Sequence, residues 1–358
     1  MGSKNSHGTI YIQLEQSSSS GGEEVIGIIH ISLKTLLSSP TLILSFKGKE
    51  TTHWEETRTV STKNSDGESD SETVTDYYDG KYLICDHRHS VFKWNNELTP
   101  GDYSIPFTFI LPENIPGSFS YTSSSTLAKI QYKFYAQITT SSHKVSGKVL
   151  IHIHQDITIF NTNIILDRSA KMRSWCFYNK GTCTISAHSP QDTYNPSQTA
   201  VFFVNVNNSR SQLAIQSISC ELFCNLRLQS SSKTNKFIKE SLIKKNFPMK
   251  INPFDEELHE PMEIYIELGQ KLNSLQSMYS TKGIIINCSY TCRIEAVMEA
   301  RLMCCGEYPR IEMPMIIIPN VIQPQPSAPI DPQDWRPEIL PQVNFKSGQE
   351  SEIRYLDN

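Results

Sequence analysis

The sequence predicts an all-β protein built from β-sandwiches or barrels, and two observations support this. The first is strict alternation of apolar and polar residues in several segments, which is typical of half-buried strands. The second is that short polar turns separate these segments, as SSSSGG does before residues 24–33. The clearest alternating segments are residues 10–14, 42–46, 130–138 and 218–228.

Length and composition narrow the class of protein further. A chain of 358 residues is long enough for about two domains. Its formal net charge of −4 is unlike that of a basic nucleic-acid binder. We find no signal peptide and no apolar run of about 18 residues. With nine cysteines and no export signal, we expect a reducing, cytoplasmic compartment. Gly2 and Ser6 fit a myristoylation pattern, an N-terminal modification that would attach the protein to membranes.

The best-delimited strand of the N-terminal half lies between residues 100 and 112. Its alternate residues are apolar, and they are Tyr103, Ile105, Phe107, Phe109 and Leu111. The Pro100–Gly101 pair turns the chain into the strand, and Pro112 ends it because proline has no N–H to donate. Pro106 falls on the opposite face, which is tolerated at an edge or a bulge.

An acidic stretch, STKNSDGESDSETVTDYYDG, occupies residues 61–80. It has no apolar face to bury, so we expect a mobile insert loop between two strands. Ser65, Ser69 and Ser71 lie among acidic residues and would suit acid-directed kinases.

The second half has the same alternating pattern. The even positions of a long segment after residue 283 are apolar, while its odd positions include Arg293, Glu295 and Arg301. Residues 235–246 are the one place where we expect a helix. After Pro319 the chain becomes rich in proline, which predicts an extended tail over residues 320–358.

The proline-bracketed strand and the segment after it resemble the arrestin family. The matching residues are Pro100, Gly101, Pro106, Phe107, Phe109, Leu111, Pro112, Pro116, Ser118 and Phe119, followed by Ile130, Tyr132 and Ala136. Residues 176–183, 200–211 and the last strands before Pro319 resemble the family's C-terminal domain. The resemblance implies two tandem immunoglobulin-like β-sandwich domains, at 1–160 and 164–319, with a hinge near Phe160–Asn163 and the proline-rich extended tail after them.

The resemblance also implies a function. Visual and β-arrestins sense receptor phosphates through lysines near the N-terminus, whereas this chain has none between Lys4 and Lys34. It is more similar to the α-arrestin, or arrestin-domain-containing, branch. That branch recruits ubiquitin ligases through PPxY motifs, but no two prolines are adjacent here. The expected role is a non-enzymatic adaptor in endosomal sorting, monomeric when isolated, that binds cytoplasmic regions of membrane proteins peripherally at endosomal or plasma membranes.

Two alternatives to the sorting adaptor remain open. The same fold could serve as a constitutive structural subunit of a larger assembly, or as a Vps26-like subunit of a retromer-type complex. An enzyme is not expected, since the sequence has no G-x-S-x-G, P-loop or H-E-x-x-H motif.

Several cysteines and histidines have spacings that could suit a metal ion. Cys220, Cys224, Cys288 and Cys292 have ligand-like spacing, but they lie on the apolar faces of their strands and are expected to fill the core. Cys176, Cys183, Cys304 and Cys305 could converge on one structural zinc. The pairs His87/His89 and His152/His154 each share a strand face, and His152 and His154 are expected to face water. No other cofactor is expected.

One short motif in the tail points to a partner. Pro326, Ser327, Ala328 and Pro329 resemble the P-[ST]-A-P peptide that the UEV domain of the ESCRT-I complex binds. An exposed, extended, proline-rich segment suits such a groove because it loses little conformational entropy on binding.

Overall fold

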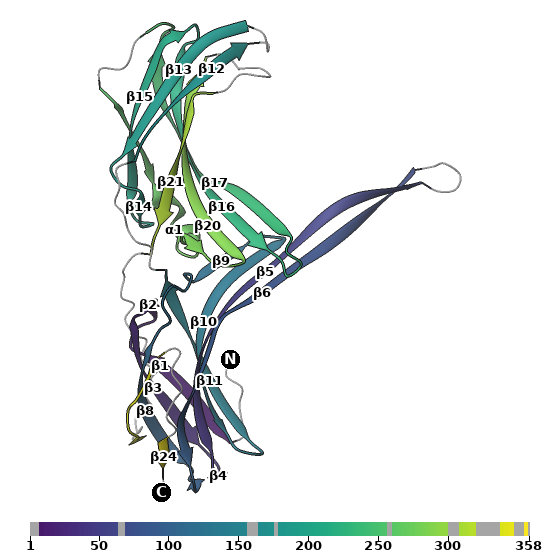
Figure 1. The fold of residues 1–358 in the computed structure, drawn as a ribbon, viewed down its shortest axis with the longest axis vertical. Helices are drawn as coiled ribbons and strands as arrows, with labels where there is room; N and C mark the ends of the chain where they lie inside the picture. The colour runs from purple at the N-terminus through teal and green to yellow at the C-terminus, as the bar shows by residue number, and fades with distance from the viewer. Residues whose placement is uncertain are drawn as a thin grey trace.

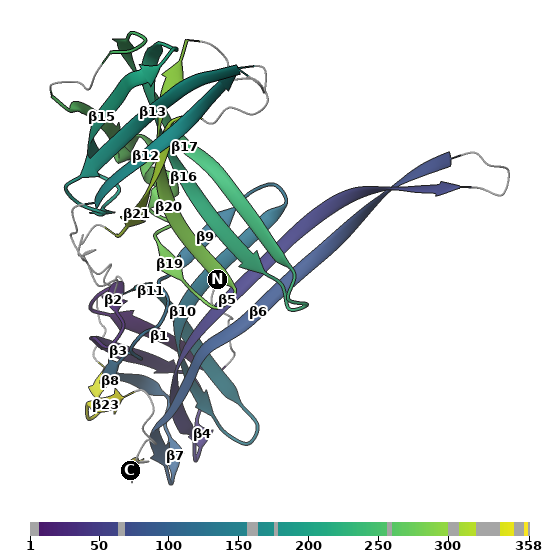
Figure 2. The same ribbon diagram turned by 45° about the horizontal axis from the view of Figure 1, so that its top comes forward.

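A computed structural model gives the architecture of the protein (Figure 1). It describes residues 7–63, 69–155, 164–174, 178–255, 260–299, 308–319, 337–346 and 354–356. These residues form two β-sandwiches that lie end to end, with one long hairpin leaving the body at their junction (Figures 1 and 2). The all-β, two-sandwich prediction is confirmed.

The N-terminal sandwich consists of two main sheets and one small one. The five-stranded sheet contains β1, β3, β8, β22 and β23, in the order β1-β3-β8-β22 with β23 also on β8. The seven-stranded sheet has the order β2-β11-β10-β5-β6-β24, with β9 on β10. The strands of this half are β1 Gly8–Leu14, β2 Ser18–Ser20, β3 Glu24–Leu33, β4 Leu37–Ser38, β5 Thr41–Lys63, β6 Ser69–Trp94, β7 Glu97–Leu98, β8 Gly101–Ile110, β9 Phe119–Thr122, β10 Thr126–Thr139 and β11 Lys144–His154.

The C-terminal sandwich packs a four-stranded sheet, β12-β13-β15-β18, on a six-stranded one, β14-β21-β20-β16-β17 with β19 on β20. A 3-10 turn η1 (Leu268–Lys271) and a single helical turn α1 (Leu272–Leu275) precede β19. None of the helices in the described ranges is long and apolar enough to cross a membrane. The strands are β12 Ile164–Ser174, β13 Tyr178–Ser189, β14 Thr193–Tyr194, β15 Thr199–Ser211, β16 Ile215–Gln229, β17 Asn235–Ile251, β18 Met262–Glu267, β19 Thr281–Lys282, β20 Ile286–Met298 and β21 Arg310–Ile317.

The alternating apolar residues of the predicted strands are the ones that the fold buries. Every second residue of β10 from Thr126 to Ile138 is buried, and β20 alternates in the same way from Ile286 to Met298. The apolar face of β8 is buried as well, and its aromatic rings pack with those of the facing sheet, since Phe109 lies 5.4 Å from both Phe46 and Phe134 between ring centroids. The core therefore lies where the period-2 pattern predicts it.

The helix expected at residues 235–246 is wrong, because these residues belong to strand β17. They pair along their length with β16, from Gln229↔Asn235 to Ile218↔Phe247. Lys236, Lys239, Lys244 and Lys245 lie on this edge strand, where lysine is favoured because it discourages pairing with other chains. Pairing with β16 outweighs the weak local preference for a helix.

Much of the insert loop expected at residues 61–80 is strand instead, while residues 64–68 lie outside the described residues. Residues 61–63 and 69–80 continue β5 and β6, with an unbroken register from Trp54↔Tyr78 to Lys63↔Ser69. This stretch and its partner strand are rich in threonine, valine and tyrosine, which favour strands, and cross-strand hydrogen bonds satisfy the backbone without a buried face.

Residues 337–346 and 354–356 of the tail are described, and the strands that they form are packed on the body. Strands β22 (Glu338–Ile339) and β23 (Val343–Lys346) pair in parallel with β8, and β24 (Arg354–Leu356) pairs in parallel with β6. The two β8 partners cover Tyr103–Ser104 and Phe107–Ile110 but not Pro106, the residue without an N–H. The tail strands thus extend the β8 edge of one sheet and the β6 edge of the other.

Candidate functional site

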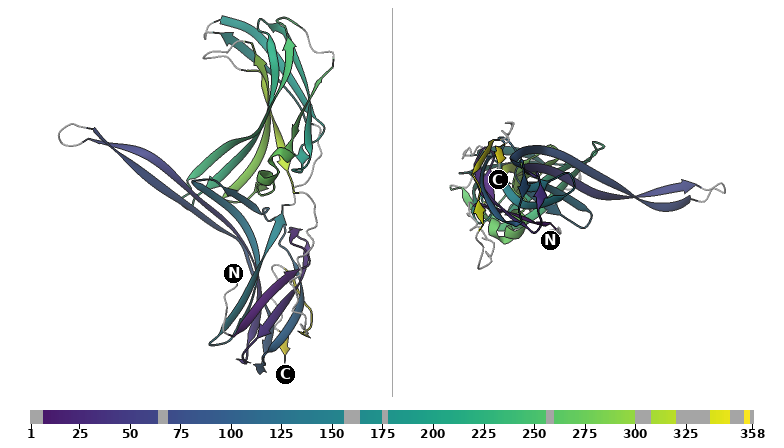
Figure 3. Two further views of the ribbon diagram at one scale, coloured as in Figure 1. Left: turned by 180° about the vertical axis from the view of Figure 1, so that it is seen from behind. Right: turned by 90° about the horizontal axis from the view of Figure 1, so that it is seen from below.

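The long β5–β6 hairpin, here called the arm, is the most exposed structured feature of the molecule (Figure 3). It comprises residues 55–63 and 69–79, and the body holds its base through main-chain hydrogen bonds of Glu55 and Asp79. Trp54 closes its base: the indole is fully buried, stacks on Tyr78 at 5.2 Å and donates a hydrogen bond to Glu56 Oε1 at 3.1 Å. A two-stranded ribbon has little stability of its own in water, so this buried base and the cross-strand contacts must hold it.

The two faces of the arm differ chemically. On one face the register places hydroxyls opposite each other, in the pairs Thr57↔Thr75, Thr59↔Thr73 and Ser61↔Ser71. The other face carries Glu56, Asp76 and Glu72, and its one described ion pair joins Arg58 Nε to Asp76 Oδ2 at 2.9 Å. Both faces are accessible, so the arm offers a polar face and an acidic face to a partner.

The two sandwiches are joined by a fully buried carboxylate, that of Glu50. Glu50 lies on the inward-facing side of β5, and its carboxylate accepts hydrogen bonds from three backbone N–H groups of the C-terminal sandwich. Oε1 accepts from Ile284 at 2.8 Å, and Oε2 accepts from Ile285 at 2.9 Å and from Ile286 at 3.0 Å. A cluster of main-chain N–H groups is a common way to hold an anion. Gly283 is needed beside it, since a Cβ there would lie 2.7 Å from the carboxylate oxygens.

Further polar contacts cross the same interface. Thr52 Oγ1 donates to the Gln229 carbonyl at 2.9 Å, and the Ser231 N–H donates to the Asp79 carbonyl at 2.8 Å. Gln155 Oε1 accepts from Thr281 Oγ1 at 3.2 Å and from the Lys282 N–H at 2.9 Å. These bonds join groups of both sandwiches directly, so separating the sandwiches would exchange them for bonds to water.

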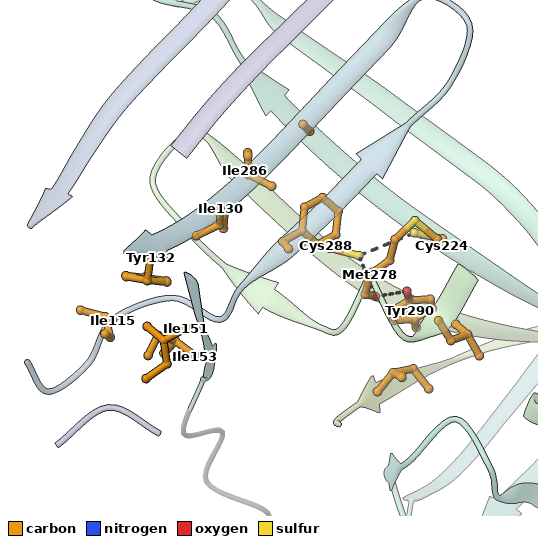
Figure 4. Close-up of a cluster of buried hydrophobic side chains, with 14 of the residues drawn as sticks. Ile115, Ile130, Tyr132, Ile151, Ile153, Cys224, Met278, Ile286, Cys288 and Tyr290 are labelled. Carbon is orange, nitrogen blue, oxygen red and sulfur yellow. Dashed lines mark hydrogen bonds between the residues drawn. The ribbon is translucent and has the colours of Figure 1, made fainter. Parts of the chain in front are cut away.

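Apolar side chains and two thiols pack at this junction (Figure 4). On the C-terminal side, Cys288 Sγ lies 3.6 Å from Cys224 Sγ, and the Tyr290 hydroxyl donates to the Met278 carbonyl. The hydrogen bond to Cys224 and burial together raise the pKa of the Cys288 thiol well above its usual value. A neutral, buried thiol behaves as a small apolar side chain.

The remaining pair of core cysteines is arranged in the same way. Cys220 Sγ and Cys292 Sγ are 3.3 Å apart and buried, and burial raises the pKa of Cys292. All four cysteines are free thiols that fill the core, which confirms the prediction. Within the described ranges, no three His, Cys, Asp or Glu side chains gather as metal ligands would.

A small cavity opens between the sandwiches, beside strands β9, β10 and β11. Its volume is about 130 Å³, and its lining includes Lys129, Leu150, His152, Tyr132 and Tyr279. Most of the lining surface is apolar, and Lys129 and His152 add polar groups to it. A cavity of this size and character suits one aliphatic side chain of a bound peptide.

The tail is anchored at an apolar contact that the sequence did not reveal. Phe345 of β23 stacks on His89 of β6 with ring centroids 4.8 Å apart, and Phe109 meets the imidazole edge-on at 5.7 Å. Both ring nitrogens of His89 are buried without a hydrogen-bond partner among the described residues. Burial, and then the neighbouring His87, lower the pKa of His89, so the ring is neutral.

The sites expected from the sequence are only partly within the described residues. Cys183 is buried on β13, where burial raises its thiol pKa to about 12. Cys176, Cys304 and Cys305 lie outside the described residues, as do Pro326–Pro329, Ser65 and the hinge at 160–163. His152 is exposed, as expected, while His154 is half-buried.

The proline-bracketed motif has a structural role in the described fold. The Tyr132 hydroxyl donates to the Pro116 carbonyl at 2.6 Å, and Ser118 Oγ accepts from the Ile153 N–H at 2.9 Å. These bonds fix the loop after β8 against β10 and β11. The sequence analysis does not identify Glu50 or Gly283, although a glutamate among the inward-facing apolar positions of the segment Leu42–Trp54 is a usable signal.

Comparison with known proteins agrees with this architecture. Residues 8–162 match the family model of the arrestin (or S-antigen) N-terminal domain, and residues 179–321 match that of the arrestin C-terminal domain. A curated relative, Arrestin domain-containing protein A of Dictyostelium discoideum, is 23% identical over 214 residues, which cover 56% of this chain and 34% of that protein. Two sandwiches, each matched by its own arrestin model, show that this chain belongs to the arrestin family.

Proposed function

We propose that this protein is a sorting adaptor that holds the cytoplasmic part of a membrane protein and links it to endosomal machinery. Arrestin proteins are in general non-enzymatic adaptors for membrane-protein cargo, and both arrestin domains are present here. The observation that carries the proposal is the presence of both domains, held together by the buried Glu50 contact, in a chain whose described residues contain no metal-ligand cluster. Such a molecule acts by presenting surfaces.

The arm and the nearby cavity are the surfaces that suit cargo best. The arm is accessible on both faces, and the 130 Å³ cavity lies between the sandwiches close to its base. An extended cargo segment that places one aliphatic side chain in the cavity would reach the arm within a few residues, at about 3.3 Å per residue. Side-chain sockets of this kind provide specificity for bound peptides.

The tail motif Pro326–Pro329 is the proposed link to sorting machinery. It belongs to the stretch between β21, which ends at Ile317, and β22, which begins at Glu338. A peptide covering this stretch should bind an ESCRT-I UEV domain, and its Pro329→Ala version should bind much more weakly. Equal, weak binding of the two peptides would remove this link from the proposal.

One purification separates the adaptor from its alternative, a fixed structural or retromer-type subunit. The native protein is recovered under gentle lysis and its companions are identified with their stoichiometry. An adaptor should bring substoichiometric membrane proteins and sorting components, whereas a fixed subunit should bring the same partners at equal amounts in every preparation. The second outcome would contradict the proposed function.

A further inference from the structure

The outer face of the four-stranded sheet in the C-terminal sandwich is hollowed by a groove of about 410 Å³, here called the outer groove. This volume is within the range of about 300–1,000 Å³ that is usual for binding pockets. The groove lies on the side of the sandwich away from the arm, because the arm base contacts the turn between β16 and β17 of the other sheet (Figures 1 and 2). Its lining includes Ile165 of β12, Ser186 and His188 of β13, Phe203 and Asn205 of β15, and Pro261 before β18.

The floor of the outer groove is apolar and open to solvent. The strand register places Ile165, His188 and Phe203 side by side in one row across β12, β13 and β15. The rings of His188 and Phe203 stack with centroids 5.8 Å apart, and Ile165 is 71% exposed. Apolar side chains gathered at a hollow in a polar surface are typical of a binding site, because a partner that covers them removes their surface from water.

Two carboxylates flank this apolar row. Glu263 of β18 is the register partner of Phe203, and Asp167 lies two residues beyond Ile165 on the same face of β12. Both side chains are exposed, and neither carboxylate has an ion pair or a hydrogen bond with a residue that the structure describes. Arg168, the neighbour of Asp167, stands on the opposite face of β12 because strand side chains alternate. The rim of the groove is therefore negative.

The chemistry of the groove selects a partner that is basic and apolar. Lysine and arginine side chains can lay their aliphatic stems on Ile165 and Phe203 while their charged ends reach the carboxylates. A cation above the Phe203 ring would add a cation–π contact. An anionic lipid surface would instead be repelled by Asp167 and Glu263. Charge complementarity thus favours a basic polypeptide segment over a membrane.

The sheet also sets the direction and the spacing of that segment. Strands β13 and β15 are each paired on both sides, so a partner at the groove crosses the strands and is held by side chains rather than as an added strand. Three strand spacings of about 4.8 Å separate β12 from β18, and the two acids are offset by two residues along the strands. Asp167 and Glu263 are therefore roughly 16 Å apart along the sheet, which an extended segment of about five residues spans.

We propose that the outer groove binds a basic segment of a partner protein, in which apolar residues lie between two cationic side chains about five positions apart. The cationic side chains contact Asp167 and Glu263, and the apolar residues between them pack on Ile165 and Phe203. This site goes beyond the adaptor role proposed above, which uses the arm, the cavity between the sandwiches and the tail. It gives the C-terminal sandwich a docking surface of its own.

The test uses the full chain and the fluorescent peptide GSRSLLSRSG, whose two arginines have the required spacing. Its affinity is measured by anisotropy at low and high salt. The variant D167N/E263Q should bind about fivefold more weakly at low salt, as expected for the loss of two exposed charge contacts, and should lose most of the salt dependence. The matched control E240Q/E299Q removes the same charge from exposed positions elsewhere in the C-terminal sandwich and should bind like the unmodified protein. Ile165→Ser should weaken binding without changing its dependence on salt.

Several results would overturn the inference. Equal affinities of D167N/E263Q and E240Q/E299Q for the peptide would show that the two acids do not form the site. Equal affinity for a peptide with glutamate in place of both arginines would show that charge does not select the partner. Sedimentation of the unmodified chain covers a third case: self-association that D167N/E263Q abolishes would make the occupant a second copy of this chain and not a separate partner.

Discussion

At the scale of single residues, two polar side chains occupy positions where the period-2 pattern predicts apolar ones. Glu50 and His89 both lie on the inward-facing sides of their strands, and both are buried. Glu50 is satisfied by three N–H groups, while the described surroundings of His89 supply no hydrogen bond. Burying a polar group costs little when it is bonded and a good deal when it is not. The first residue therefore links the two sandwiches, and the second is expected to make the tail contact sensitive to pH.

Replacing Glu50 should weaken the junction of the two sandwiches. Glu50→Ala leaves three buried N–H groups without an acceptor, which should cost about 3 kcal/mol of unfolding free energy. Chemical denaturation should then show two transitions where the unmodified protein shows one. Glu24→Ala, at an exposed position of the same sandwich, serves as the control. A single, unshifted transition in Glu50→Ala would contradict this role.

Acid should loosen the tail through His89. Burial lowers the pKa of His89 in the docked state below its ordinary value of 6.5. The contribution of His89 to tail docking is therefore fully present above the ordinary pKa of 6.5. It falls as the pH drops below that value, because the imidazole takes up a proton when the tail is undocked. The charged groups around the ring are few: β6 contributes His87, while Phe109 on β8 and Phe345 on β23 are uncharged.

The measurement for His89 is the labelling rate of a thiol placed in the tail by Val343→Cys. Lowering the pH from 7.5 to 5.5 should raise this rate relative to the same protein carrying His89→Phe, in which no group titrates. His89→Phe should also stabilise docking by about 1 kcal/mol, because two unpartnered nitrogens are removed. A rate ratio that does not change with pH would refute the role of His89.

Zinc binding by four cysteines is a further prediction about single residues. If Cys176, Cys183, Cys304 and Cys305 bind zinc, purified protein should contain one equivalent, and Cys304→Ala with Cys305→Ala should release it. Cys220→Ala serves as the control, since it should cost about 1 kcal/mol of stability without changing metal content. Metal-free protein of unchanged stability would exclude the site.

At the scale of elements, the arm shows that a strand can form without a core. From Glu55 to Lys63 and back to Asp79, the two strands satisfy each other's hydrogen bonds and keep register. Their threonines and valines favour the extended backbone, while their acidic residues keep the edges from pairing indiscriminately. The arm is therefore an element whose sequence is suited to an exposed position.

Shortening the arm should weaken cargo capture while leaving the stability of the fold unchanged. Joining Thr57 to Thr75 through Asn-Gly makes a two-residue hairpin turn and keeps Trp54, Glu56, Asp76 and Tyr78. The removed residues contact no core, so the free energy of unfolding should change by less than about 0.5 kcal/mol. Capture of membrane proteins from cells should fall sharply. Retained capture by the shortened protein would place the cargo contact elsewhere.

At the scale of the whole molecule, long-range contacts turn two sandwiches and a tail into one body. Glu50 and Ile284 are separated by 234 positions, and Thr108 Oγ1 donates to Asn344 Oδ1 across 236 positions. Strand β23 of the tail pairs with β8 and strand β24 pairs with β6, so the tail adds strands to both main sheets of the N-terminal sandwich.

The sequence alone determined the β-sandwich class, the buried face of strands such as β8 and β10, and the core role of Cys220, Cys224, Cys288 and Cys292. All of these follow from period-2 alternation within one strand, which is a local property. Family resemblance added the two-domain order. What only the tertiary structure decided were contacts between distant segments: the strand state of residues 69–80 and 235–246, the Glu50 junction and the tail strands on β8. The physical reason is that strand pairing depends on which strands become neighbours, and a single chain's local pattern does not specify neighbours.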